Sequence, residues 1–236
     1  MLFSKEKLEQ VAEKSLYTTF TNSATIEYSF KIFRRFLQPG KILELGPAEG
    51  LMTAHLIELD ASLTAIEGSN FFSRELKIKF PTINLINELF ENATLYTKFE
   101  NIILGHVLEH VDNPVLILEL IKKWLKPGGT VLCAVPNARS IHRQAAVEMN
   151  LLKSVFSMSE KDIHHGHLRI YTPELLRADF IEAGYNIIHA GGYWLKPISD
   201  KQIDQHWNIE MLDAFMRLGE SYPDIAGEIY IIGNIK

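Results

Sequence analysis

Two short segments carry residues suited to binding a nucleoside. The first, ILELGPAEG at residues 42–50, is an apolar run that contains an acid and is followed by Gly46 and Gly50. It predicts a buried strand and then a tight turn whose backbone can approach a ligand closely. The second is an apolar run, residues 62–66, that ends in Glu67, about twenty positions after Gly46. A carboxylate placed there can accept hydrogen bonds from ribose hydroxyls, so the two segments together predict a site for a nucleoside-containing cofactor.

The spacing of the glycines argues against two other kinds of nucleotide site. A dinucleotide-binding turn has glycine at its first, third and sixth positions, whereas here Ala48 is third and Leu51 is sixth. A phosphate-binding P-loop needs a Lys-Ser/Thr pair after the turn, and none follows. A nicotinamide-dependent oxidoreductase is therefore disfavoured, although it would use the same general sheet.

The histidines are the best candidates for acid/base chemistry, because a histidine side chain exchanges protons near neutral pH. Five of the nine histidines fall into two groups. His106 and His110 flank the turn after the strand predicted near residue 102, and three more lie in the segment IHHGHLR at residues 163–169. We predict that His165 and His167 act as acid/base or acceptor-orienting groups, with His110 as a further candidate. His106 is interpreted as a wall of the cofactor pocket.

Other roles for these side chains remain open. His110 could simply hold its turn, and His167 could anchor its loop. Arg169 could pair with an acidic acceptor or with Glu109. The histidines and a nearby acid could also bind zinc or iron, but their spacing matches no standard metal-binding motif. The sequence therefore predicts no metal.

The periodicity of apolar residues predicts the elements that would position these groups. Helical patterns cover residues 24–37, 52–59, 71–80, 114–125 and 173–183, and apolar strand runs lie near residues 42, 63, 83, 102, 131 and 186. This alternation predicts a parallel sheet with helices on both faces. Asp112 or Asn113 before Pro114, and Thr172 before Pro173, are signals for helix N-termini. Gly184 predicts the end of the late helix.

Four segments, in order, resemble the class I S-adenosylmethionine-dependent methyltransferases, specifically their small-molecule, ubiquinone-biosynthesis-like branch. They are the Glu-x-Gly-x-x-x-Gly turn, FENIILGHVLEHVDNP at 99–114, LKPGGTVLCAVPN at 125–137 and GHLRIYTPELLRADFIEAGY at 166–185. The resemblance covers roughly residues 41–185. It implies a Rossmann-like, mostly parallel sheet of seven strands, in which the final strand, within residues 227–236, is antiparallel and lies between strands five and six.

The same resemblance implies which residues contact S-adenosylmethionine. The glycine turn would pack against the methionine portion, Glu67 would bind the ribose, and the segment after the third strand would bind adenine. Many relatives carry an acid where this chain has Leu89, so we expect no adenine amino contact from that side chain. The expected contacts are Gly46, Pro47, Ala48, Gly50, Glu67, Gly68, Ser69, Leu89, Phe90, Gly105 and His106.

Composition fits one enzyme domain spanning residues 1–236. The chain is 47% hydrophobic, so it can bury a full core, and its net charge of −5 argues against nucleic-acid partners. A single cysteine, Cys133, excludes an intramolecular disulfide and indicates a reducing compartment. No targeting or membrane segment is visible, so we predict a cytoplasmic protein and allow for a homodimer. The helical segment 1–40 and the insertion 138–165 are expected to cover the substrate.

We therefore predict transfer of a methyl group to oxygen or nitrogen of a small metabolite, sugar or lipid-linked acceptor. The alternative is a non-catalytic partner subunit that binds the cofactor. The acceptor itself is not identified by the sequence. Aromatic residues that could line its pocket are Tyr17, Phe20, Tyr28, Phe156, Tyr171, Tyr193 and Trp194.

Overall fold

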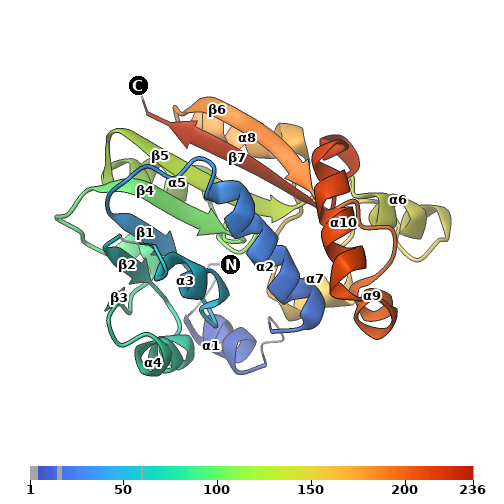
Figure 1. Ribbon diagram of the computed structural model, residues 1–236, viewed down its shortest axis with the longest axis horizontal. Coiled ribbons are helices and arrows are strands. Elements are labelled where there is room, and N and C mark those ends of the chain that lie inside the picture. The colour runs from blue at the N-terminus through green and yellow to red at the C-terminus, as the bar shows by residue number, and fades with distance from the viewer. Residues whose placement is uncertain (1–4, 15–17, 60, 236) are drawn as a thin grey trace.

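The centre of the protein is a seven-stranded sheet with the strand order β3-β2-β1-β4-β5-β7-β6 (Figure 1). A computed structural model describes residues 5–14, 18–59 and 61–235. Strands β1 to β5 are parallel, and β7 runs antiparallel to both β5 and β6. The predicted sheet, with its last strand inserted antiparallel between the fifth and sixth, is confirmed. The strands are β1 Ile42–Leu45, β2 Leu63–Ile66, β3 Asn84–Ile86, β4 Phe99–Gly105, β5 Leu125–Pro136, β6 Asn186–Tyr193 and β7 Glu228–Asn234.

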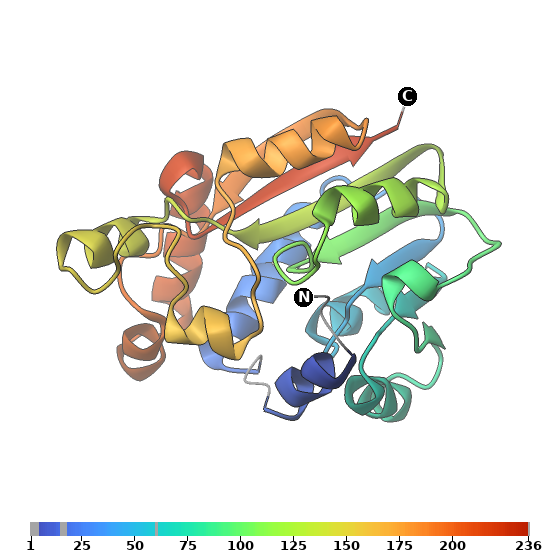
Figure 2. The same ribbon diagram turned by 180° about the vertical axis from the view of Figure 1, so that it is seen from behind.

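Helices cover both faces of this sheet. In Figure 1, α2 and α10 lie in front of the strands, whereas α5 and α8 lie in front in the reverse view of Figure 2. The helices are α1 Lys5–Glu13, α2 Phe20–Phe33, α3 Leu51–Leu56, α4 Asn70–Lys79, α5 Pro114–Lys122, α6 Ile141–Glu148, α7 Glu160–His164, α8 Pro173–Glu182, α9 Asp200–His206 and α10 Ile209–Glu220. Two short 3₁₀ helices are η1 Phe90–Asn92 and η2 Pro223–Ile225. None of the helices in the described ranges is long and apolar enough to cross a membrane.

Alternating side chains along the strands build two separate apolar cores. In β4, Ile102 and Leu104 pack into the core beneath α5 and α8, while Ile103 packs into the core beneath α2, α3 and α10. Cys133 lies in the first core and is fully buried, as the sequence predicts. Because successive residues of a strand point to opposite faces, one apolar run can supply both cores.

The predicted helix ends are mostly confirmed. The Asn113 side chain accepts a hydrogen bond from the backbone N–H of Leu116, and Thr172 caps α8 in the same way. Three predicted ranges are wrong by three or four residues: α2 spans Phe20–Phe33 rather than 24–37, α3 ends at Leu56 rather than 59, and α5 ends at Lys122, before the predicted residue 125. The reason for the last difference is that Leu125 already pairs with Phe99 in the sheet, so the Pro-Gly-Gly sequence at 127–129 makes a bulge within β5.

Candidate active site

A cavity of about 560 Å³ opens at the carboxyl ends of the parallel strands, where open α/β sheets bind ligands. We divide its wall into two parts. The cofactor half contains the glycine turn and the residues after β2, β3 and β4: Gly46, Pro47, Ala48, Glu67, Gly68, Leu89, Phe90, Gly105 and His106. The acceptor half is lined by Glu109, His110, Lys161, His165, His167, Trp194, Lys196, Asp200 and Glu228.

The glycine turn brings backbone rather than side chains to the cofactor half. Gly46 has φ +61°, a left-handed conformation that favours glycine. A Cβ at this position would lie 3.3 Å from Cγ2 of Val107, so the absence of a side chain keeps the wall open. Pro47 has no N–H, and the neighbouring Ala48 donates its own N–H to Glu67 Oε2 at 3.0 Å.

Glu67 joins the turns that follow β1 and β2. Besides Ala48, its carboxylate accepts the backbone N–H of Ser69 at 2.8 Å, and the side chain is 4% exposed. Burial raises the pKa of Glu67 to about 7, although the two backbone donors oppose this shift. A carboxylate held in this way on the cavity wall can accept hydrogen bonds from ribose hydroxyls.

The structure does not bring two of the predicted cofactor residues to the cavity wall. Gly50 instead caps α3 with φ +83°, and a Cβ there would lie 2.4 Å from the Phe80 ring. Ser69 caps α4 through the backbone N–H of Phe72 and donates its hydroxyl to Glu9. Both residues shape the turns, and neither lines the cavity.

Helix α1 forms part of the cofactor half, which the sequence did not predict. Leu8 and Val11 line the cavity. The Glu9 carboxylate accepts the backbone N–H groups of Asn70 and Phe71 at 2.5 and 3.2 Å. These N–H groups lie in the first turn of α4, where the helix itself offers them no acceptor and a negative charge is favourable. Glu9 therefore anchors α1 beside the cofactor half.

Arg169 holds the turn after β4. Its guanidinium donates to the backbone carbonyls of Leu108, Val111 and Asp112, and not to Glu109, so the Glu109 alternative for Arg169 is wrong. The backbone N–H of Leu168 also donates to the Glu109 carbonyl at 2.8 Å. The loop before α8 is thereby fixed to this turn, which places His167 beside His110.

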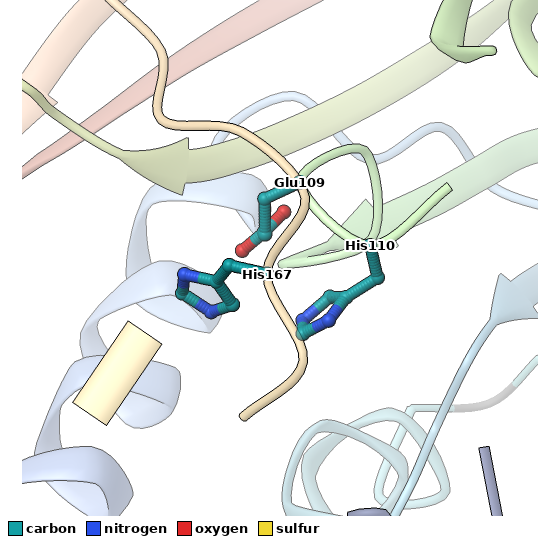
Figure 3. Close-up of side chains that lie close together, drawn as sticks. All are labelled: Glu109, His110 and His167. Atoms are coloured by element: carbon teal, nitrogen blue, oxygen red, sulfur yellow. The ribbon is translucent and has the colours of Figure 1, made fainter. Parts of the chain in front are cut away.

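Glu109, His110 and His167 form a cluster at the acceptor half (Figure 3). The two imidazole rings meet edge to face, with centroids 4.8 Å apart, and the His165 ring lies 6.2 Å from that of His167. The three predicted catalytic histidines therefore line one part of the cavity. His106, in the left-handed region at φ +58°, places Nδ1 3.5 Å from Glu109 Oε1.

Burial and charge give these groups different proton affinities. Burial lowers the pKa of His110 to about 4 and that of His165 to about 3, so both rings are neutral near pH 7. Burial also acts against a charged His106, but the carboxylates of Glu109 and Glu228 outweigh it and raise its pKa. Burial acts to raise the pKa of Glu109, but the neighbouring histidines, chiefly His106, outweigh this effect and lower that pKa.

The remaining charges of the acceptor half are paired. Lys161 and Lys196 each lie 2.6 Å from an oxygen of Asp200. The sequence did not single out these residues, nor Glu109 and Glu228, as parts of the site. Glu228 carried a usable signal, because it is an acid that opens an apolar strand, as unusual as Glu44 within β1.

The insertion at residues 138–165 reaches the cavity through Lys161 and His165. Inside it, the buried Arg143 side chain connects α6 to α7. It donates to Asp162 Oδ2 and to the Val155 carbonyl, both at 3.0 Å, and to the carbonyl of Ser157. We call this segment the cap; Lys161 and His165 are its residues on the wall of the acceptor half.

We predict that the cap is more mobile than the sheet when no ligand is bound. It packs through a few polar contacts rather than through the two apolar cores, and such segments open locally at low cost. Hydrogen exchange of the ligand-free protein should show faster exchange in residues 138–165 than in β4 and β5. Arg143→Ala should increase the exchange rate of this segment further, with Lys153→Ala, an exposed residue of the same segment, as the control. Protection equal to that of the sheet would contradict this prediction.

The aromatic candidates divide between core and cavity. Trp194 lines the acceptor half. Tyr28 and Tyr193 stack on each other within a core, with centroids 5.6 Å apart, and Tyr171 lies in the other core. Phe156 is 51% exposed on the cap, and Phe20 is also exposed. Tyr17 lies outside the described residues.

The sheet order, the antiparallel seventh strand and a nucleoside-sized cavity at the strand ends define a class I S-adenosylmethionine-dependent methyltransferase. The chain belongs to the methyltransferase domain family, which matches residues 23–190. Its cofactor is accordingly S-adenosylmethionine, and the resemblance found in the sequence is confirmed.

Three similar proteins illustrate this relationship. A ubiquinone biosynthesis O-methyltransferase of Agrobacterium fabrum is 22% identical over 182 residues, which cover 74% of this chain and 69% of that protein. The mitochondrial ubiquinone biosynthesis O-methyltransferase of Schizosaccharomyces pombe is 28% identical over 120 residues, which cover 47% of this chain and only 44% of the yeast protein. A methyltransferase structure from Thermotoga maritima, described as a possible histamine N-methyltransferase, has a TM-score of 0.64 at 16% identity, covering 91% of each chain.

The raised pKa of Glu67 predicts that cofactor binding depends on pH. Below about pH 7 the free protein carries a proton on this carboxyl. Ribose hydroxyls donate to the ionised form, so binding displaces that proton, and affinity should rise as the pH increases through 7 and fall below it. The change is at most about tenfold per pH unit. Calorimetric titration with S-adenosylmethionine from pH 6 to 8 measures it. Glu67→Gln cannot ionise and should remove the dependence; a slope that persists in this variant would assign it to another group.

Proposed function

We propose that this methyltransferase transfers the methyl group to a hydroxyl oxygen of a small-molecule acceptor bound beneath the cap. The observation that carries the proposal is the acceptor half, where Glu109, His110 and His167 adjoin the cofactor half of the same cavity. A polar, buried cluster at that position suits an acceptor whose hydroxyl must lose a proton. An apolar wall alone would give no means of removing it.

The reaction is an in-line displacement at the sulfonium methyl. The acceptor oxygen forms a bond to the methyl carbon while the sulfur–carbon bond breaks, and S-adenosylhomocysteine leaves as a neutral thioether. The hydroxyl proton passes to a ring nitrogen of the histidine cluster, for which His110, His165 and His167 are the proposed candidates. Because the cofactor is already activated, the protein contributes mainly alignment and exclusion of water.

The size of the cavity supports a small acceptor. About 560 Å³ must accommodate the cofactor as well as the acceptor, and cavities for small molecules typically measure 300–1,000 Å³. The net charge of −5 argues against extensive contact with a nucleic-acid backbone. The names of the two sequence relatives support oxygen as the methylated atom.

A labelled methyl group tests the proposal. The protein is incubated with S-adenosylmethionine carrying a ¹³C-methyl group and a metabolite extract, and the products are analysed by mass spectrometry and NMR. We expect label in a low-molecular-mass product with the chemical shift of a methyl ether or ester. Label on nitrogen would contradict the proposed acceptor atom. Binding of the cofactor with no product in any fraction would support the non-catalytic partner subunit instead.

Two further proposals come from the sequence alone, namely a cytoplasmic location and a homodimer. Microscopy of the tagged protein and sedimentation equilibrium would measure them.

A further inference from the structure

The geometry points to a binding site for one divalent transition-metal ion, held by Glu109, His110 and His167 at the acceptor half of the cavity. Each residue offers one ligand atom, and these atoms lie within 4.8 Å of one another (Figure 3). Two ligands come from the turn after β4, and the third comes from the loop that Arg169 fixes to that turn. The spacing of the histidines in the sequence could not show this, because the ligands belong to separate segments.

The Glu109 carboxylate is the first observation that calls for a cation. It is 1% exposed, and neither of its oxygens accepts a hydrogen bond from any residue in the described part of the chain. The nearest nitrogen recorded for it is His106 Nδ1, at 3.5 Å, and the lysines of the same cavity half are engaged by Asp200. A buried carboxylate without hydrogen bonds is costly unless positive charge lies beside it.

The second observation is that one of the two histidines has a carboxylate on its outer side. Nδ1 of His167 lies 3.2 Å from Asp162 Oδ1. Histidine ligands of metals characteristically donate one ring N–H to a carboxylate or carbonyl, which leaves the other nitrogen as the ligand. Asp162 is itself fixed by Arg143 Nη1 at 3.0 Å and by the N–H of Ser159 at 2.8 Å.

The donor set selects the kind of ion. Two imidazoles and one carboxylate suit Zn²⁺, Mn²⁺, Fe²⁺ or Co²⁺ better than Mg²⁺ or Ca²⁺, which prefer oxygen ligands. Three protein ligands leave coordination positions open, as in catalytic metal sites. The three residues line the acceptor half of the cavity, where the acceptor is proposed to bind.

The ion's role rests on the proposed function, whereas its binding does not. A hydroxyl that coordinates a divalent ion loses its proton more readily, so the proton can pass to solvent before the oxygen attacks the methyl carbon. The ion would then activate the hydroxyl, in place of a ring nitrogen of His110 or His167. The competing arrangement has no metal, and a protonated His106 alone balances the charge of Glu109.

Titration with Co²⁺, whose visible absorption reports its ligands, distinguishes the two arrangements. The protein is first dialysed against a chelator and then against metal-free buffer. We expect one Co²⁺ per chain with the spectrum of nitrogen and oxygen ligation, displaced by Zn²⁺. Glu109→Gln and His167→Ala should each weaken binding by more than about a hundredfold, above the range for losing an outer-shell partner. His164→Ala is the matched control, because His164 lies outside the cluster and contacts the Lys14 carbonyl, and it should bind Co²⁺ like the wild type.

Absence of stoichiometric Co²⁺ binding, or equal binding by wild type, Glu109→Gln and His167→Ala, would overturn the metal site. S-adenosylmethionine affinity of each variant shows that it is folded, and a metal content measurement on the untreated protein gives a second readout independent of the variants. Methyl transfer that continues at full rate in chelator would leave the proposed function intact and contradict the ion's role. Metal binding without methyl transfer to oxygen would leave the metal site intact and contradict the proposed function.

Discussion

Replacing His165 or His167 with alanine is expected to lower the rate of methyl transfer, by about 10²–10⁴-fold for the residue that acts in proton removal. S-adenosylmethionine affinity should stay nearly unchanged. The reason is spatial: both side chains line the acceptor half, whereas the glycine turn and Glu67 form the cofactor half. Single-turnover rates with the identified acceptor, together with calorimetric titration of the cofactor, measure the two effects separately.

The size of the loss distinguishes the roles of these histidines. A side chain that only orients the acceptor should cost less than one that takes part in removing the proton. His164→Ala serves as the control, because it removes a neighbouring histidine of the same segment and should retain the full rate. If His165→Ala and His167→Ala both turn over like the wild type, neither does acid/base work, and the assignment moves to His110 or to the acceptor itself.

Glu67→Ala is expected to weaken S-adenosylmethionine binding by about 1–3 kcal/mol, which is roughly 5–150-fold. The variant loses the acceptor for the ribose hydroxyls. It also leaves the backbone N–H groups of Ala48 and Ser69 without the carboxylate that holds both turns in place. Isothermal titration calorimetry at pH 8, where Glu67 is ionised, gives the affinity directly.

Glu58→Ala provides the control for this experiment. Glu58 is an exposed acid that follows α3, and it is not part of the cavity wall. Its removal changes the net charge equally and should leave the affinity as it is. An unchanged affinity in Glu67→Ala would show that the ribose lies elsewhere.

The sequence was informative wherever a local pattern decides the outcome. The alternation of Ile102, Ile103 and Leu104 predicts a strand between two cores, and Asn113 before Pro114 predicts the start of α5, because both depend on neighbours in the chain. The glycine pattern of the first turn likewise predicts a close backbone approach, which φ +61° at Gly46 agrees with.

Contacts between distant segments were the part that could not be predicted. Glu9 at the start of α4, and Arg169 on the carbonyls after β4, each join residues about sixty positions apart. Their partners are backbone groups, which leave no signature in residue type. The sequence also could not separate Gly50, which is needed for the α3 cap, from Gly46, which lines the cavity.

A crystal structure of the complex with S-adenosylhomocysteine would show where the reacting centre lies, on which both the cofactor assignment and the proposed chemistry depend. The expected arrangement has the ribose hydroxyls within hydrogen-bond distance of Glu67. The adenine should lie beside Leu89 and Phe90, and the sulfur should face the cluster of Glu109, His110 and His167. A complex in which the sulfur points away from that cluster, or in which Glu67 does not contact the ribose, would contradict it.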